Sequence, residues 1–367
     1  MIDVTKINEE LSKNNSSWVA GENWLTQLTD EQRAAMCNPV TDIPAVAVMR
    51  SGEAPYEHSD AYDLRDVDGI SHVSSVKNQG SMPLCSLFSV VAAMESKWMR
   101  QGNPEIDLSE QDAAFCSTHG ETNNYGIVSI QVINDIKKRG ITTEDKFTNQ
   151  QAYDNNFHCF HHPDRLASTY TLDSFTDMVS NDHMKWFIEN VGAVICVLNI
   201  YNDFFAYSSG IYVSDRIGAT AGHSVLVVGF NDIENYWIIK NSWSSEWGED
   251  GFIRVAYGDI PIMENPGVPR QGIHNVMPFI PHGITLEDPF IKAEKDAAEI
   301  SHYIYSPYPW TANSDKEWCT IQESGDGDGF MTISLAQNAT TCPRFATITV
   351  LSRGHEKTML VKQRGTL

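Results

Sequence analysis

The chain has 367 residues, of which 41% are hydrophobic and 20% are charged, and its formal net charge is -22. This length predicts two or three domains, and nine Trp, thirteen Tyr and fifteen Phe exclude a disordered chain. The acidic charge argues against nucleic acids and anionic membrane surfaces as partners.

Residues 1 to about 57 are mostly helix-forming and then become extended, with Pro44, Gly52 and Pro55 in "TDIPAVAVMRSGEAPYEHSD". The pattern predicts a helical segment followed by an extended connector that a protease can cut. No run of about 18 apolar residues occurs anywhere, so we expect no membrane span.

The next region is predicted to be helical. "SLFSVVAAMESKWM" has the apolar spacing of a buried helix that begins at or near Cys85. Ser109 caps a second helix in "DLSEQDAAFCS", and Gly140 ends a third in "SIQVINDIKKRG".

After about residue 165 the sequence becomes typical of antiparallel strands. The runs "GAVICVLNI", "SVLVVGFN", "ENYWIIKNSW" and "GFIRVAYG" are short, branched and aromatic. A helical half followed by a β-rich half predicts an α+β domain over 58–281 with a cleft between the halves. From residue 282 to 367, short alternating runs separated by Gly, Asp and Asn turns predict a small all-β sandwich.

Cys85 has the setting that a cysteine nucleophile requires. It follows a turn containing Gly80 and Pro83 and precedes a helix, whose unpaired N–H groups favour a thiolate. Gln79 lies six residues upstream, from where its amide can reach the same point. Taken alone, a cysteine at this place is more often a buried core residue.

A base for such a nucleophile is predicted at His223, which precedes the alternating strand "SVLVVGF". Asn241 follows eighteen residues later and can accept the ring N–H, while Trp243 and Trp247 exclude water from that bond. The 138-residue separation of Cys85 and His223 falls in the range of papain-type enzymes. Seven cysteines without a CxxC pair or a zinc-type cluster predict no metal site, and we expect no other cofactor.

Five segments in order resemble the papain family of cysteine peptidases, and together they span about residues 58 to 280. They are "VKNQGSMPLCSLFS", "SEQDAAFC", "VGAVICVLNIYNDFFAYSSGIYV", "GHSVLVVGF" and "YWIIKNSWSSEWGEDGFIRV". The resemblance implies a two-lobed fold, with a helical lobe and an antiparallel β-barrel lobe. It implies Cys85 as nucleophile, His223 as acid and base, Asn241 as the residue that orients His223, and Gln79 as oxyanion donor.

The resemblance also implies further residues of the cleft. It predicts a disulfide between Cys116 and Cys159. Substrate would contact Gly126, Ala221, Gly222, Val276 and Trp243, with a hydrophobic residue preferred two positions before the cut. The sequence departs from the family where Ser86 replaces the usual Trp after the nucleophile. This replacement warrants an alternative hypothesis, a catalytically impaired binding protein that kept the fold.

Residues 1–57 are similar to the short propeptide of cathepsin B-like enzymes, through Trp18, Ala20, Gly21, Asn23 and Cys37. By this resemblance the segment blocks the cleft as an intramolecular inhibitor, so the chain is a zymogen cleaved somewhere in 45–60. Cys37 is expected to be a packing residue, with a contact or bridge to Cys85 as the alternative.

Residues 282–367 resemble a BACON-type, immunoglobulin-like sandwich, through Trp310, Trp318, "GDG", Asn338, "RFATITV" and "VKQRG". Cys319 and Cys342 are expected to be bridged there. Such domains are associated with glycans, with surfaces or with spacing, and the aromatic residues are expected in the core. A third hypothesis makes this sandwich the functional part.

Cys196 is expected to be an inert strand cysteine. His161 and His162 resemble the paired histidines of the cathepsin B occluding loop, but the insertion is too short, so they are expected to be exposed turn residues. Taken together, these features predict a secreted, periplasmic or cell-surface cysteine endopeptidase that acts on peptides or proteins. Its signal peptide is expected to be absent from this chain.

Overall fold

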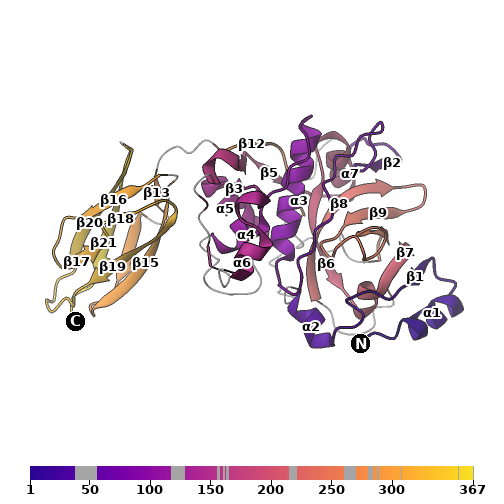
Figure 1. Cartoon of the computed structure of the whole chain (residues 1–367), viewed down its shortest axis with the longest axis horizontal. Helices are drawn as coiled ribbons and strands as arrows, with labels where there is room; N and C mark the ends of the chain where they lie inside the picture. The colour runs from indigo at the N-terminus through magenta and orange to yellow at the C-terminus, as the bar shows by residue number, and fades with distance from the viewer. Residues whose placement is uncertain are drawn as a thin grey trace.

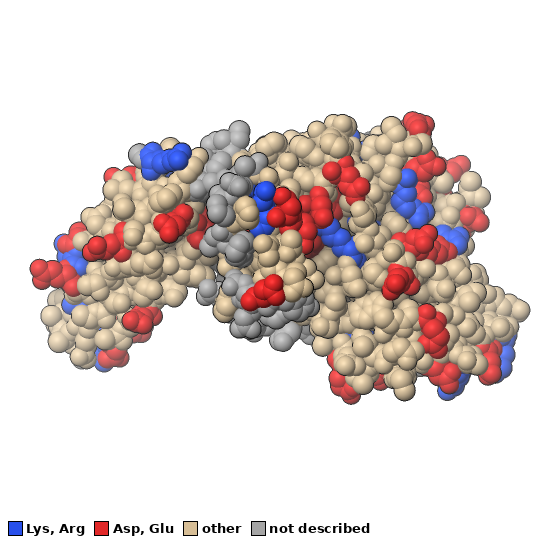
Figure 2. Space-filling view, in the orientation of Figure 1, with Lys and Arg blue, Asp and Glu red and all other residues tan. Residues whose placement is uncertain are grey.

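A computed structural model describes most of the chain. The described residues are 1–37, 56–116, 129–154, 158–159, 162, 165–214, 221–259, 270–279, 284–286, 289–306, 308–353 and 355–366. Figure 1 shows a two-lobed body, with the C-terminal sandwich at one end and the N-terminal segment against the β-rich lobe at the other. Acidic side chains outnumber basic ones on the face in Figure 2 and are spread over the body and the sandwich.

The helical lobe is built around one long helix, α3 (Cys85–Arg100), whose first residue is Cys85. Its residues Val90, Val91 and Met94 are fully buried, as the apolar spacing predicts. The other elements of this lobe are α4 (Glu110–Phe115), α5 (Ser129–Arg139), β3 (Ile141–Thr142), η2 (Glu144–Lys146), α6 (Asn149–Asp154), η3 (Arg165–Ser168), β4 (Thr169–Leu172) and β12 (Val276–Pro278).

The β-rich lobe contains a sheet of nine described strands in the order β1-β7-β10-β9-β8-β6-β11-β5, with β2 paired to β8. The central strands β8 and β9 are buried except at the two end residues of β8, which matches their continuous apolar sequence. The elements of this lobe are β2 (Ala61–Asp63), β5 (Phe175–Asp177), α7 (Asn181–Asn190), β6 (Val194–Ile200), η4 (Asn202–Ala206), β7 (Tyr207–Tyr212), β8 (Ala221–Asn231), β9 (Tyr236–Lys240), β10 (Phe252–Ala256) and β11 (Arg270–Ile273).

The N-terminal segment comprises α1 (Val4–Lys13), β1 (Trp18–Ala20) and α2 (Asp30–Ala35). Strand β1 extends the sheet of the β-rich lobe by pairing antiparallel with β7, with Trp18 opposite Gly210. Gly210 has φ +96°, and a Cβ there would lie 2.2 Å from the Ser17 carbonyl oxygen, so only glycine permits this approach. A complete capping box between Thr29 and Gln32 starts α2.

The C-terminal domain is the expected sandwich of two sheets, ordered β13-β15-β19-β17 and β14-β21-β20-β16-β18, around one apolar core. Its strands are β13 (Thr285–Leu286), β14 (Phe290–Ala293), β15 (Ala298–Tyr305), β16 (Trp310–Ser314), β17 (Cys319–Ile321), β18 (Ser324–Gly325), β19 (Gly329–Leu335), β20 (Arg344–Ser352) and β21 (His355–Gln363). Trp310 lies in the core, as expected of these aromatic residues, and a Cβ at Gly325 would lie 2.5 Å from its ring.

The expected bridge between Cys319 and Cys342 is wrong, because neither cysteine is in a disulfide. Cys319 faces the sandwich core, whereas Cys342 is exposed in the loop between β19 and β20. A strand cysteine that points inward cannot meet a thiol outside the core without a backbone movement.

Candidate active site

Cys85 occupies the first turn of α3 and is fully buried. The cap residue Leu84 offers no side-chain hydrogen bond to the helix. Backbone N–H groups at this helix end have no intrahelical acceptor, and they favour negative charge on a nearby sulfur. Ser86, the departure from the family pattern, is also buried.

His223 and Asn241 form a buried pair. The ring Nε2 of His223 lies 2.7 Å from Asn241 Oδ1, so Nε2 donates and Nδ1 is the acceptor nitrogen of the neutral ring. Nδ1 is buried and has no hydrogen-bond partner among the described residues. Trp243 stacks on the imidazole, with a centroid separation of 4.6 Å, and is itself fully buried. The pair is therefore shielded from water, as the sequence predicts.

The surroundings of His223 keep its imidazole neutral in this state. Burial lowers the pKa of His223 to about 4, and the hydrogen bond to Asn241 opposes this shift. A buried imidazolium is unfavourable because it loses its hydration. The ion pair that a cysteine–histidine mechanism needs is thus disfavoured while the site is covered.

A hydrogen bond ties α3 to the strand that carries His223. Ser89, one turn after Cys85, and Ser224, the residue after His223, have their hydroxyl oxygens 2.7 Å apart in the buried region between the lobes. Helix α3, which carries Cys85, and strand β8, which carries His223, are therefore in contact at this point.

Gln79 is held by contacts on both ends of its amide. Its Oε1 accepts a hydrogen bond of 2.6 Å from Ser242, the residue after Asn241. Its Nε2 donates to the carbonyl oxygens of Met82 at 2.8 Å and Met36 at 2.9 Å. Met36 belongs to the N-terminal segment, so a backbone carbonyl of that segment occupies the donor predicted to bind the oxyanion.

The N-terminal segment covers the site by several contacts. Trp24 donates its indole N–H to the Trp243 carbonyl at 3.2 Å. Arg33 is buried and donates to the carbonyls of Leu25 and Leu28, which fixes the turn before α2. Met36, just after α2, is fully buried.

Cys37 is a buried thiol with no disulfide in this structure, as expected of a packing residue. Burial raises its pKa, and the neighbouring Cys85 adds to the increase. The two cysteines are thus near one another, although no bond joins them.

A cluster of buried charges lies next to Asn241. Lys77 Nζ lies 2.9 Å from Glu95 and 3.0 Å from Glu110, and Lys240 donates to Ser74, which in turn donates to Glu95. The charged side chains line a small cavity that also touches Asn241. Burial lowers the pKa of Lys240 and raises that of Glu110, and the Lys77 ammonium opposes the latter shift.

The predicted substrate-binding residues lie in different parts of the structure. Ala221 and Gly222 directly precede His223 on β8, with Ala221 half-buried. Gly126 lies outside the described residues, as does His161 of the histidine pair. Trp243 stacks on the imidazole beneath the N-terminal segment.

The placement of Val276 in this pocket is wrong. Its backbone N–H and C=O bond the side chain of Gln101 at the C-terminal end of α3, each at 2.9 Å. Cys85 lies sixteen residues earlier, which is roughly 24 Å along a helix. Val276 pairs with β4 in the helical lobe, so it cannot line a pocket beside His223.

Other cysteines match their predicted roles. A disulfide joins Cys116, at the end of α4, to Cys159. Cys196 is fully buried on β6, and burial raises its pKa to about 12.

No group of side chains suited to a metal ion occurs in the part of the chain that the structure describes, and no described helix is long and apolar enough to cross a membrane.

Sequence reasoning missed Ser242 and Met36. Ser242 lies directly after Asn241 in "KNSW", so its adjacency was a usable signal for a second role of that motif. Met36 carried no signal, because its contribution is a backbone carbonyl placed by a contact 43 residues apart in sequence.

The fold and this site together define a class: a two-lobed cysteine-hydrolase fold whose candidate active site is covered by its own N-terminal segment. A family model described as "Papain family cysteine protease" matches residues 58–268. The chain therefore belongs to the papain family. A second model, described as "Viral BACON domain", matches residues 290–366.

Curated relatives are similar over the same region. Oryzain gamma chain of Oryza sativa subsp. japonica is 32% identical over 52% of this chain and 53% of its own length. Falcipain-2b of Plasmodium falciparum is 29% identical over 61% of this chain and 47% of its own length. The match spans about half the length of these relatives.

Solved structures with the same fold include precursor forms. One is a digestive procathepsin L 3 from Tenebrio molitor larval midgut. The match covers 74% of this chain and 88% of the procathepsin chain, with 22% identity and a TM-score of 0.60. A procathepsin B from Trypanosoma congolense covers 75% and 98%, with 16% identity and a TM-score of 0.59. The near-equal scores do not favour one propeptide type over the other.

Proposed function

We propose that this chain is the zymogen of a papain-like cysteine endopeptidase that hydrolyses peptide bonds in peptides or proteins. The observation that carries the proposal is the Gln79 amide, which holds the Met36 carbonyl of the N-terminal segment beside the His223–Asn241 pair. A donor that binds a backbone carbonyl in the closed state is suited to bind the oxyanion of a substrate in the open state.

In the proposed mechanism, His223 takes the proton of the Cys85 thiol through Nδ1, and the thiolate attacks the scissile carbonyl. The Cys85 N–H and Gln79 Nε2 stabilise the oxyanion. His223 then protonates the departing amine and afterwards activates the water that hydrolyses the acyl-enzyme. Asn241 keeps the ring in the tautomer that presents Nδ1 to the sulfur.

The proposed division of the chain is an inhibitory propeptide at 1–57, a peptidase domain at 58–281 and a sandwich at 282–367. Contacts made by Tyr56 and Ser59 narrow the range in which the cleavage site is expected. Tyr56 stacks on His183 at 4.3 Å, and the Ser59 N–H bonds Glu189 at 2.8 Å. These contacts favour cleavage within 45–55, which would leave Tyr56 and Glu57 on the peptidase domain and end the propeptide slightly before residue 57.

The finer details of the proposal follow from the same residues. Ala221 and Gly222 are small and precede His223, which supports a hydrophobic substrate side chain two positions before the cut. The Cys116–Cys159 disulfide suits an oxidising compartment, so we place the protein outside the cytoplasm, secreted, periplasmic or on the cell surface. Binding of a surface glycan by the sandwich has no support here, because Trp310 lies in its core.

The test is covalent labelling. An epoxide that alkylates cysteine thiolates should add one mass increment at Cys85 in the processed chain and none at Cys85 in the zymogen, whose site is covered; peptide mapping separates this from any labelling of the exposed Cys342. The same processed sample should hydrolyse peptides. A processed chain that is labelled at Cys85 but hydrolyses no peptide would favour the impaired binding protein, and one that is not labelled would contradict the proposed site.

Replacing Trp18 by Ala should release the propeptide. Trp18 is 2% exposed, packs against Tyr212 at 5.0 Å and donates its indole N–H to Val213 at 2.9 Å. Truncating a buried Trp costs about 3–5 kcal/mol, which weakens closure by about 10²–10⁴-fold. We expect the variant to process itself faster and to be labelled at Cys85 before processing.

The matched control is Val19→Ala on the same strand, because Val19 is 52% exposed. It should behave like the unmodified zymogen. Equal processing rates for the Trp18 and Val19 variants would show that β1 does not hold the propeptide closed.

A further inference from the structure

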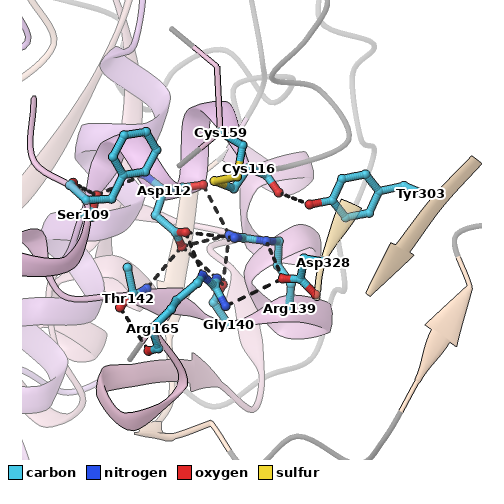
Figure 3. Close-up of a disulfide and its surroundings, with 11 residues drawn as sticks. Ser109, Asp112, Cys116, Arg139, Gly140, Thr142, Cys159, Arg165, Tyr303 and Asp328 are labelled. Carbon is cyan, nitrogen blue, oxygen red and sulfur yellow. Dashed lines mark hydrogen bonds and ion pairs between the residues drawn. A yellow bond between two sulfur atoms is a disulfide. The ribbon is translucent and has the colours of Figure 1, made fainter. Parts of the chain in front are cut away.

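The C-terminal sandwich contacts the helical lobe at a buried network of charges. Asp112 on α4 accepts hydrogen bonds from two guanidinium groups. Arg139 donates to both of its carboxylate oxygens at 2.9 Å, and Arg165 also donates to both oxygens at 2.9 Å (Figure 3). The side chains of Asp112, Arg139 and Arg165 are 0%, 1% and 7% exposed. One carboxylate therefore faces two buried positive charges.

The second negative charge comes from the sandwich. Asp328, just before β19, places Oδ2 3.8 Å from Arg139 Nε and 3.7 Å from Arg165 Nη1. Its other oxygen accepts the Ser306 N–H at 2.7 Å, so the carboxylate is fixed by its own domain. Arg139 Nε is buried without a hydrogen bond among the described residues, and it faces this carboxylate.

Two acidic and two basic groups make the network neutral. Without Asp328, the lobe would keep one excess positive charge at this position, which is unfavourable in a poorly hydrated site. Burial alone would raise the pKa of Asp112, but Arg139 and Arg165 outweigh it and hold that pKa well below its usual range. The Asp112 carboxylate therefore stays ionised at mildly acidic pH.

A second contact lies beside the disulfide. Tyr303 on β15 is 2% exposed and donates its hydroxyl to the carbonyl of Cys116 at 2.6 Å. Figure 3 shows Tyr303 reaching Cys116 from the sandwich while Asp328 lies near the two arginines. The Tyr303 contact ends on the residue after α4, whereas Asp328 reaches α4 only through Arg139 and Arg165, which hold Asp112.

Helix α4 also contacts the segment that carries Gln79. Glu110, two residues before Asp112, lies 3.0 Å from Lys77 Nζ. Lys77 comes two residues before Gln79, the proposed oxyanion donor. One short helix thus joins the charges under the sandwich to the segment that carries the Gln79 amide.

We propose that the C-terminal sandwich is a brace for the helical lobe, which fixes α4 through Asp328 and Tyr303 and so helps to position Gln79. Domains joined by a linker usually move relative to one another. Here the neutral buried network and the Tyr303 hydrogen bond make the sandwich a fixed part of the peptidase. The surface around Arg139, Arg165 and Cys116 is its docking site.

The test uses the full chain with Asp328→Asn and, separately, Tyr303→Phe. Asn keeps an oxygen for the Ser306 N–H, and Phe keeps the ring contact to Phe330 at 4.8 Å, so the sandwich itself should fold in both. The matched control is Asp326→Asn, two residues away and exposed. A lowered unfolding temperature of the sandwich alone would not count as support.

Two readouts must change together. Amide hydrogen exchange in 110–116 should become about tenfold faster, because opening of α4 no longer breaks a neutral buried network. After processing, kcat should fall by about two- to thirtyfold with KM unchanged, because Gln79 acts on charge that forms in the transition state. The Asp326 variant should match the unmodified chain in both.

Unchanged exchange or unchanged kcat in both variants would overturn the brace. The kcat measurement rests on the proposed peptidase function, whereas the exchange measurement does not. If the processed, unmodified chain hydrolyses no peptide, the proposed function fails, and the exchange rates alone decide whether the sandwich fixes α4.

Discussion

Replacing Cys85 by Ala should abolish peptide hydrolysis and leave the propeptide attached. Removal of the nucleophile from a triad-type site lowers kcat by on the order of 10⁴ to 10⁶-fold. The buried site should tolerate the change, because Ala keeps the helix start of α3 and removes only the sulfur. Mass spectrometry of the purified zymogen, incubated at acidic pH, should show the intact chain.

Two comparisons make this result specific. Cys342→Ala removes an exposed thiol of the sandwich and should process itself like the unmodified chain. Adding a trace of processed, unmodified enzyme to the Cys85 variant should cleave it within 45–55, which shows that its connector is accessible. Self-processing by the Cys85 variant alone would contradict the assignment of the nucleophile.

Acidification should open the zymogen through His223. Its pKa is about 4 in the closed state, because burial disfavours the imidazolium, and about 6.5 for an ordinary exposed imidazole. The open state therefore binds more protons between these values. The contribution of neutral His223 to closure is complete above about pH 6.5 and is lost as pH falls toward 4.

The size of this effect follows from the two pKa values. A difference of about 2.5 pKa units corresponds to about 3–4 kcal/mol, or roughly a three-hundredfold change in the open population. Hydrogen exchange of β1 and α2 between pH 4 and 8 measures the opening once intrinsic exchange rates are corrected for. The Cys85→Ala background prevents cleavage during the measurement.

The control for this titration is Cys85→Ala combined with His223→Gln. Gln has no proton to bind in this range, so this double variant should lose the part of the pH dependence between 4 and 6.5 that His223 causes. Other groups that titrate in this range contribute equally to both proteins. Equal slopes in the two proteins would show that another group controls opening.

Several features of the site could be predicted because they depend on short stretches of sequence. The helix that starts at Cys85 follows from its apolar spacing and the preceding turn. The pairing of His223 with Asn241 follows from two neighbouring strands, β8 and β9, that must lie antiparallel. The alternation of the last 80 or so residues predicts a sandwich without specifying which cysteines face inward.

The errors share one cause. Val276 and the Cys319–Cys342 pair were assigned from resemblance to known families, but the side of a sheet or the end of a helix that a residue reaches is set by packing. Val276 pairs with β4 at the far end of α3, and Cys319 points into a core that Cys342 lies outside.

By itself, the sequence determined the family, and it predicted the order of the domains and four candidate catalytic residues, because each lies in a local pattern with its own chemistry. Only the tertiary structure decided that Met36 meets Gln79 and that Asp328 faces Arg139 and Arg165. These contacts join residues 43 to 189 positions apart, and such pairs are selected by the burial of whole surfaces rather than by any local propensity.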